Sequence, residues 1–255
     1  MTTAARTDNP NTTDSLQLYA AGSLKTALTE LAQAYEAVSG RTVTGTFGAS
    51  GLLKTDIVNG ARADLFASAN MEHPQALHDA GLSGPVALFA RNELCALAKA
   101  GLAVDPDSLL AVMLDPEIRL GTSTPKADPS GDYAFACFAR ADRIEAGLRQ
   151  ALEAKALKLT GAKDSAFPPA GQNVYGWHIA QGHADLFLTY RTNALAARRE
   201  YPDQQLVALP DTLAVGAAYG LTVMNRAPQA ATALADFILS QPGQTILTGY
   251  GFAAA

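Results

Sequence analysis

The sequence has little charge and no long apolar run. Only 17% of its 255 residues are charged, the formal net charge is −5, and no cluster of lysine or arginine appears. The basic surface with which nucleic-acid-binding proteins hold phosphates is therefore missing. No apolar run reaches the ~18 residues of a membrane-spanning helix. Hydrophobic residues nevertheless make up 48% of the chain, which is enough for a large core.

Cysteine and histidine are also scarce, and neither is spaced for metal binding. We expect Cys95 and Cys137 to be buried free thiols, because free cysteine packs as a small apolar group. A disulfide between them is left open, since sequence separation does not forbid one. The chain has four histidines, and they form no metal motif: His73, His78, His178 and His183. We therefore predict no metal site and no cofactor.

Signatures of catalysis are absent as well. The chain has no Walker-type phosphate loop and no GxSxG nucleophile motif. Neither "GASG" nor "PSG" is accompanied by a histidine and an aspartate in a plausible order. We therefore predict that the protein is not an enzyme.

The first fifteen residues, "MTTAARTDNPNTTDS", are polar and predict a disordered arm over residues 1–15. They lack the charged start and apolar stretch of an export signal. The residues alone leave two alternatives open. Either the protein is cytoplasmic, or an export signal has been removed and a new Met stands at the start.

From residue 16 onward, short apolar strands alternate with helices, which predicts an α/β fold. The pattern is interrupted at "GLSGPVALFA" and at "LVALPDTLAVGAAYG", which we interpret as two crossings between two lobes. The predicted first lobe is discontinuous, with residues 16–86 and 209–255, and the second lobe has residues 87–208. We expect strands at 16–20, 42–48, 63–69, 118–123, within 184–194 and at 218–224, and a long extended segment at 85–100.

Four predicted helices begin with small, hydroxylated or amide residues directly after a strand or a turn. The first N–H groups of a helix are unpaired and, with the helix dipole, form a site for an anion. Each position alone is better explained as an ordinary N-cap. The candidates are Ser23 in "AAGSLK", Ser50 in "FGASGLL", Ser130 and Gly131 in "KADPSGDYAF", and Gln172, Asn173 and Val174 in "PPAGQNVYGW".

The α/β context favours a shared role for these helix starts. In open α/β sheets the loops that follow the strands line one ligand crevice, so starts from both lobes can face one another. Tyr190 in "LTYRTNA" adds a hydroxyl that can donate to an anion, although a packed strand tyrosine explains it equally well. We predict that backbone N–H groups and hydroxyls hold one oxyanion without a basic pocket.

Three stretches together form a recognisable pattern: "YAAGSLKTALTELAQAYEAVSGRTVTGTFGASGLLKTDIVNGARADLFASAN", "GQNVYGWHIAQGHADLFLTYRTNA" and "ADFILSQPGQTILTGYGF". They are similar to the periplasmic molybdate-binding proteins, which are the extracellular receptors of molybdate importers of the ATP-binding cassette type. The resemblance covers most of residues 16–252 and is strongest at the two ends.

This resemblance implies a two-lobed, type II-like periplasmic binding protein with a two-strand hinge and the ligand between the lobes. The implied function is capture of molybdate or tungstate and delivery to an importer's membrane permease, by a periplasmic monomer. Two alternatives remain open. The cargo is another oxyanion such as sulfate, or the protein is a cytoplasmic oxyanion sensor on the same scaffold.

The resemblance also assigns ligand-contacting positions. Asp128 departs from it, because an archaeal-type branch uses an aspartate there together with a glutamate, and Thr189 stands at the glutamate position. We predict that Asp128 caps its helix and faces outward, with an extra ligand contact as the alternative. The implied donors are the hydroxyl and backbone of Ser23, the hydroxyl of Ser50, the backbone N–H groups of Ser130 and Val174, and the hydroxyl of Tyr190.

Overall fold

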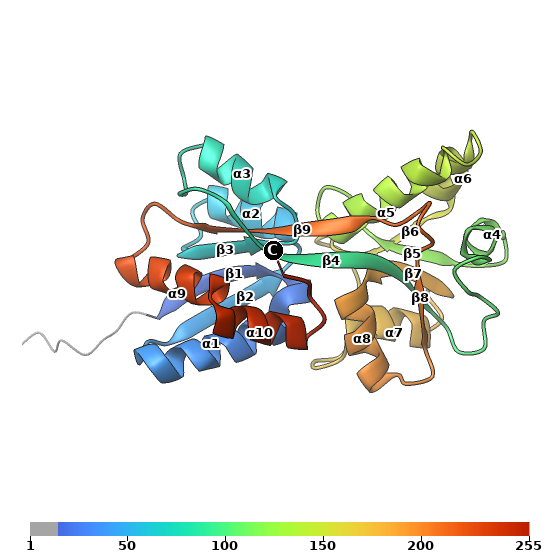
Figure 1. The fold of residues 1–255 in the computed structure, drawn as a ribbon. Helices are drawn as coiled ribbons and strands as arrows, with labels where there is room; N and C mark the ends of the chain where they lie inside the picture. Colours follow the sequence, from blue (N-terminus) through green and yellow to red (C-terminus); the bar gives the residue numbers. More distant parts are fainter. Residues whose placement is uncertain (1–14, 255) are drawn as a thin grey trace, which may run out of the picture.

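The computed structural model describes residues 15–254 and shows a mixed α/β fold of two lobes joined by two long strands (Figure 1). Nine strands form the sheet in the order β2-β1-β3-β9-β4-β7-β5-β6, with β8 paired to β4. The predicted two-lobed α/β fold is confirmed. The predicted disordered arm lies, except for Ser15, outside the described residues.

In the first lobe, parallel strands lead into helices as the sequence predicts. β1 pairs in parallel with β2 and β3, and β9 pairs antiparallel with β3. The strands are β1 (Leu16–Ala21), β2 (Val43–Gly48), β3 (Leu65–Ser68) and β9 (Gly216–Val223). The helices are the short 3-10 turn η1 (Gly22–Leu24), α1 (Lys25–Ser39), α2 (Ser50–Val58), α3 (Glu72–Asp79), α9 (Gln229–Leu239) and α10 (Gln241–Gly249).

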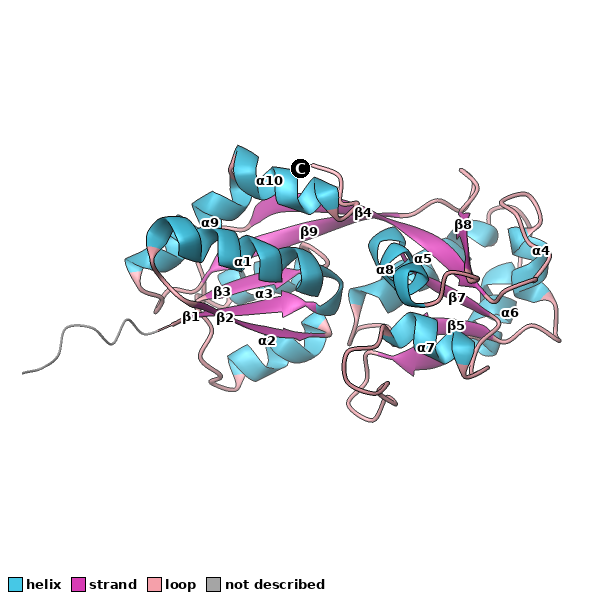
Figure 2. Ribbon diagram, turned by 90° about the horizontal axis from the view of Figure 1, so that it is seen from below, coloured by secondary structure: helices cyan, strands magenta, loops and turns pink. Residues whose placement is uncertain are grey.

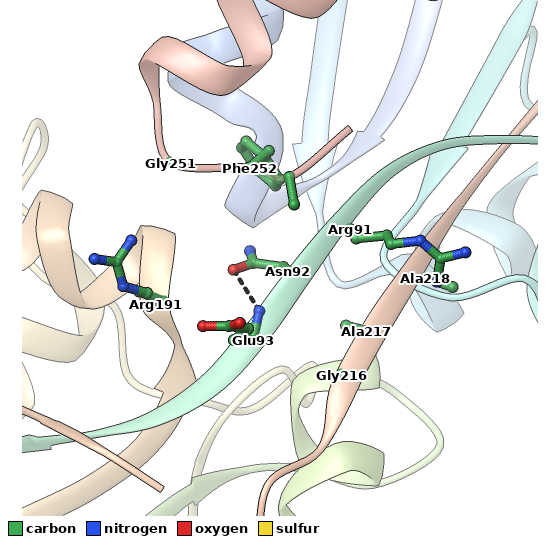
Figure 3. Close-up of a pocket in the computed structure, with 10 residues that line it drawn as sticks. Arg91, Asn92, Glu93, Arg191, Gly216, Ala217, Ala218, Gly251 and Phe252 are labelled. Atoms are coloured by element: carbon green, nitrogen blue, oxygen red, sulfur yellow. Dashed lines mark hydrogen bonds between the residues drawn. The ribbon is translucent and has the colours of Figure 1, made fainter. Parts of the chain in front are cut away.

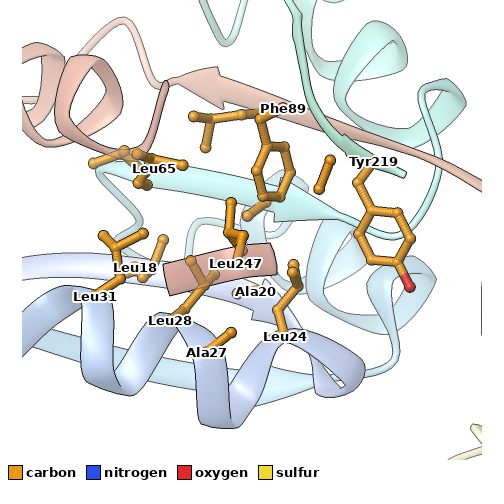
Figure 4. Packing of buried hydrophobic residues seen from close by; sticks show 14 of the residues in the cluster. Leu18, Ala20, Leu24, Ala27, Leu28, Leu31, Leu65, Phe89, Tyr219 and Leu247 are labelled. Carbon is orange, nitrogen blue, oxygen red and sulfur yellow. The ribbon is translucent and has the colours of Figure 1, made fainter. Parts of the chain in front are cut away.

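The core of the first lobe follows from the alternation of strand side chains. Leu65 and Ala67 of β3 pack into the larger cluster with α1, α9 and α10, where Leu28 and Leu31 are fully buried (Figure 4). Phe66, between them, points to the other face and packs with α2 and α3. Helices therefore cover both faces of this half of the sheet.

The second lobe is built in the same way around the other end of the sheet. α4, α5 and α6 cover one face, and α7 and α8 cover the other. The strands are β4 (Ala87–Ala98), β5 (Leu120–Ser123), β6 (Leu157–Thr160), β7 (Leu186–Tyr190) and β8 (Gln205–Ala208). The helices are α4 (Leu109–Leu114), α5 (Pro129–Ala141), α6 (Leu148–Lys155), α7 (Val174–Ala180) and α8 (Arg191–Glu200).

The two cysteines lie on opposite faces of this second half of the sheet. Cys95 of β4 packs with α7 and α8, whereas its neighbour Ala96 points to the face that holds Cys137 of α5. Both thiols are free and buried, so the prediction of free thiols is confirmed. The disulfide alternative is wrong, because the sheet separates the two side chains.

β4 and β9 are antiparallel and connect the lobes, as the view in Figure 2 also shows. The start of β4 pairs with β9, and its last residues, Leu94 to Ala98, pair with β7. Along β4, Ala90 belongs to the first core and Leu94 to the second. The exact limits of the lobes, near residues 86 and 209, stay a prediction. Within residues 15–254 no helix is long and apolar enough to cross a membrane.

Candidate anion-binding site

Ser50 and Tyr190 come from different lobes and meet at one residue, Ala69. Ser50 begins α2 and is 1% exposed, and its Oγ accepts the N–H of Ala69 at 3.2 Å. Tyr190, the last residue of β7, donates its hydroxyl to the carbonyl of Ala69 at 3.4 Å. Because Ser50 accepts in this contact, its own hydroxyl hydrogen is left for another partner.

Ser23 reaches the same region through Tyr219, a residue that the sequence reasoning missed. Ser23 lies in η1, and its Oγ is 3.0 Å from the Oη of Tyr219 on β9. The rings of Tyr219 and Tyr190 pack with their centroids 5.6 Å apart. The one available signal was a tyrosine in the predicted strand at residues 218–224, a strand that adjoins one of the two predicted crossings.

Ser130 has an enclosed hydroxyl without a partner. It lies in the first turn of α5 and is fully buried, and its Oγ has no hydrogen bond to any residue between 15 and 254. Its backbone N–H donates to Oδ1 of Asp128 at 3.0 Å, and the next N–H, of Gly131, donates to the carbonyl of Asp128. The backbone donor that the resemblance implied is thus occupied here, and the hydroxyl is the donor left over.

Asp128 caps α5 as predicted, but the expectation that it faces outward is wrong. Its side chain lies against the backbone of Gly161, where an added Cβ would be 2.5 Å from Asp128 Cβ. Gly161 also has a φ of +86°, which favours glycine there. Burial of the carboxyl group raises the pKa of Asp128 to about 6. Burial raises the pKa of Tyr190, and the charge of Asp128 adds to this rise, so both side chains belong to one region.

Val174 begins α7 in the second lobe, and within residues 15–254 it has no hydrogen bond to the other four candidates. The side chain of Asn173 caps α7 by accepting the N–H groups of Tyr175 and Gly176. The N–H of Val174, the first in the helix, is left without an intrahelical acceptor. Thr189 is buried, and its hydroxyl accepts the side-chain amide of Asn193 at 3.0 Å.

The two lobes touch directly beside these residues. The N–H of Gly51, in the first turn of α2, donates to the carbonyl of Ala127 in the second lobe at 2.9 Å. A Cβ added to Gly51 would lie 2.4 Å from the carbonyl oxygen of Lys126 and 2.7 Å from that of Ala127. The loop before α5 therefore covers the start of α2, and only a residue without a side chain fits between them.

A cavity of about 550 Å³ lies elsewhere, where β4 and β9 meet α8 and the C-terminal segment (Figure 3). Arg91 and Arg191 line the cavity but point in different directions. Glu93 lies between these two side chains in the view of Figure 3. It contains none of the five predicted ligand residues. Among residues 15–254, no group of three or more histidine, cysteine, aspartate or glutamate side chains could hold a metal ion.

The family is decided by a match to almost the whole described chain. The profile of the bacterial extracellular solute-binding proteins matches residues 16–253. The chain belongs to this family. An uncharacterised protein of Pasteurella multocida is 36% identical over 242 residues, covering 94% of this chain and 99% of that protein. The molybdate-binding protein ModA of Mycobacterium tuberculosis is 26% identical over 247 residues, covering 94% and 84%.

Solved structures of solute-binding proteins share the fold. The periplasmic molybdate-binding protein of Azotobacter vinelandii has a TM-score of 0.73 at 18% identity, with 94% of this chain and 99% of that one covered. The sulfate-binding protein SubI of Mycobacterium tuberculosis has a TM-score of 0.77 at 20% identity, with 94% and 87% covered. Identities this low carry the likeness of fold and no choice of ligand.

Proposed function

We propose that this solute-binding protein captures a tetrahedral oxyanion between its lobes, with molybdate or tungstate as the first candidate. The observation that carries the proposal is the buried hydroxyl of Ser130, which has no partner among residues 15–254. Its helix α5 packs against Tyr190 through Tyr133, and the loop before α5 contacts Gly51, the residue after Ser50. An unpaired buried polar group costs about 1–3 kcal/mol, so a ligand that accepts its hydrogen bond is favoured. The molybdate-binding relative supports the choice of cargo.

Hydroxyl and amide donors are sufficient for such a ligand. A hydrogen bond to a charged group contributes ~1.5–3 kcal/mol, so five such bonds contribute roughly 10 kcal/mol before the cost of immobilising the ligand. The surplus is compatible with micromolar affinity or better. Tyr190 serves as the fifth donor once its hydroxyl turns away from the carbonyl of Ala69, to which it donates in this structure. As donors, these groups favour a fully ionised oxyanion over one that carries its own proton.

The family supports an extracytoplasmic location and a partner in the membrane. We propose that the liganded form delivers its cargo to the permease of an importer of the ATP-binding cassette type. Closure follows if the ligand binds donors of both lobes at once, since its affinity then differs between the open and closed forms.

Sulfate is the second candidate cargo, because hydroxyl and amide donors can hold any tetrahedral dianion and the fold alone does not choose between them. Sulfate and molybdate are both tetrahedral dianions, so the size of the donor cage has to separate them. The longer bonds of molybdate expand its oxygen shell, and fixed backbone donors cannot follow a smaller ion without strain.

Titration calorimetry of the purified chain with molybdate, tungstate, sulfate and phosphate tests the proposal. We expect heat with molybdate and tungstate, and weaker binding for Ser50→Ala and Ser130→Ala by about 1–3 kcal/mol each. Ser39→Ala is the matched control, because this exposed serine lies at the far end of α1. Heat with sulfate and none with molybdate would move the cargo to sulfate, and no heat with any of the four would refute the proposal.

A further inference from the structure

Tyr219 is a buried tyrosine whose ring packs in the core of the first lobe and whose hydroxyl points out of that core. In Figure 4 the ring lies beside Phe89, and the hydroxyl points away from the leucines of the cluster. The hydroxyl oxygen is 3.0 Å from Oγ of Ser23 and 3.2 Å from Nδ2 of Asn92. Tyr219 thus connects a proposed ligand residue with an amide on the other connecting strand.

The orientation of the Asn92 amide is fixed by a backbone group. Its Oδ1 accepts the N–H of Glu93 at 2.9 Å, the contact drawn in Figure 3, and an N–H can only donate. The atom opposite is therefore the amide nitrogen. Its two hydrogens go to Oγ1 of Thr192 at 2.8 Å and to the hydroxyl oxygen of Tyr219. Asn92 is 4% exposed, so its amide is largely shielded from water.

Among residues 15–254 the hydroxyl of Tyr219 has two hydrogen-bond partners, and one of them, the amide nitrogen of Asn92, can only donate. Oγ of Ser23 is therefore the one acceptor among them for the hydrogen of Tyr219. Ser23 then accepts from Tyr219, and its hydroxyl hydrogen is left to face the ligand. We propose that Asn92 and Tyr219 are positioning residues that hold the Ser23 hydroxyl as a hydrogen-bond donor toward the bound oxyanion. This inference rests on the proposed function.

Two further observations support this chain of hydrogen bonds. Burial raises the pKa of Tyr219, so its hydroxyl keeps its hydrogen across the working pH range. The hydrogen-bond chain also includes one residue from each connecting strand, Asn92 from β4 and Tyr219 from β9. Its last member is Thr192 on α8 of the second lobe. The orientation of Ser23 in the first lobe therefore depends on groups at the junction and beyond it.

A double-mutant cycle on Ser23 and Tyr219 tests the inference, with molybdate and sulfate as the titrated anions. We expect Tyr219→Phe to weaken binding about 3- to 10-fold and Ser23→Ala about 10-fold or more. Because Tyr219 acts through Ser23, the double variant should bind no more weakly than Ser23→Ala alone. Additive losses would show that Tyr219 contacts the anion itself, which would overturn the inference.

Asn92→Asp provides a second test, because a carboxylate only accepts hydrogen bonds. The hydroxyl of Tyr219 would turn toward it, Ser23 would donate to Tyr219, and a lone pair would face the anion. We expect binding to weaken about 30-fold or more, and the loss to shrink in a Tyr219→Phe background, where only the added charge acts. An equal loss in both backgrounds would overturn the inference.

Tyr35→Phe is the control, since the Tyr35 hydroxyl donates to the carbonyl of Ala230 between α1 and α9. Melting temperatures of all variants without ligand separate lost binding from lost fold. If the wild-type protein binds none of the oxyanions, both the proposed function and this inference are refuted. If wild type binds and the losses add, the inference alone fails.

Discussion

At the scale of single residues, Ser130 and Asp128 decide how the start of α5 meets an anion. The carboxylate of Asp128 takes the first backbone donor of the helix and leaves the Ser130 hydroxyl enclosed and unpaired. A sequence identifies a serine at a helix start, but it does not say which of its two donors the cap will use. The neighbouring aspartate made that choice, because Gly161 gives its side chain room beside the helix.

Asp128→Asn should change the pH dependence of stability. Burial raises the pKa of this carboxyl group from 3.8 to about 6, so the folded protein holds the proton more tightly than the unfolded chain. Its contribution to stability is therefore present below about pH 4 and is lost as the pH rises to about 6. Asparagine also caps helices but carries no charge.

We expect Asp128→Asn to gain stability relative to wild type across this interval, by about 1–3 kcal/mol above pH 6. Urea denaturation of both proteins from pH 4 to pH 8 measures the difference, in which the other carboxyl groups cancel. A difference that does not vary with pH would contradict the raised pKa.

At the scale of secondary-structure elements, helix starts and the long strands were predictable, whereas several short elements were not. The apolar strands and glycine-containing turns located β1, α2, β3 and β4 within a few residues. The sequence pattern predicted no separate element at α4, α6 or α8, and α4 and α6 have only 6 and 8 residues, which is too short for a clear helical period. α8 starts directly after Tyr190, so strand and helix share one unbroken stretch of sequence.

Gly51→Ala should disfavour the closed arrangement of the two lobes and leave the fold of the first lobe intact. Alanine favours a helix over glycine by about 1 kcal/mol, so α2 itself gains. The new Cβ would nevertheless lie 2.4 Å from the carbonyl oxygen of Lys126, so the lobes must separate. We expect at least ~10-fold weaker anion binding, measured by calorimetry, with an unchanged or higher melting temperature without ligand.

Gly249→Ala is the control for this substitution. Gly249 also lies in a helix, and nothing lies within 4 Å of its added Cβ. Gly249→Ala should leave anion binding unchanged. Its melting temperature should change only by the small amount that the higher helix propensity of alanine causes. Equal affinity of Gly51→Ala and wild type would show that the contact with Ala127 does not limit closure.

At the scale of the whole molecule, two cores are built on one sheet whose strands β4 and β9 are shared. Each half of the sheet is covered by helices on both faces, so strand residues alternate between two clusters in each lobe. This arrangement separates Cys95 from Cys137 although both belong to the second lobe. It also brings the side chain of Tyr190, from β7 of the second lobe, into the core of the first lobe.

Thiol labelling should report this enclosed second lobe. Burial raises the pKa of Cys95 and of Cys137 to about 12, so little thiolate is present near pH 8. We expect a disulfide reagent such as DTNB to react with neither thiol quickly in the native protein and with both in urea, followed by absorbance. Mild oxidation should give no intramolecular disulfide by mass spectrometry. Rapid reaction of either native thiol would contradict the packing.

The sequence by itself determined the α/β layering, the discontinuous chain path and the positions of hydroxyl-bearing helix starts. These follow from local periodicity and from turn residues, which act over a few positions in the chain. Only the tertiary structure decided that Asp128 turns inward, that Gly51 touches the other lobe, and that Tyr219 lies within hydrogen-bond distance of both Ser23 and Asn92. Those contacts join residues far apart in sequence. The direction of each hydrogen bond depends on which hydrogen or lone pair the partner has not already used in another contact.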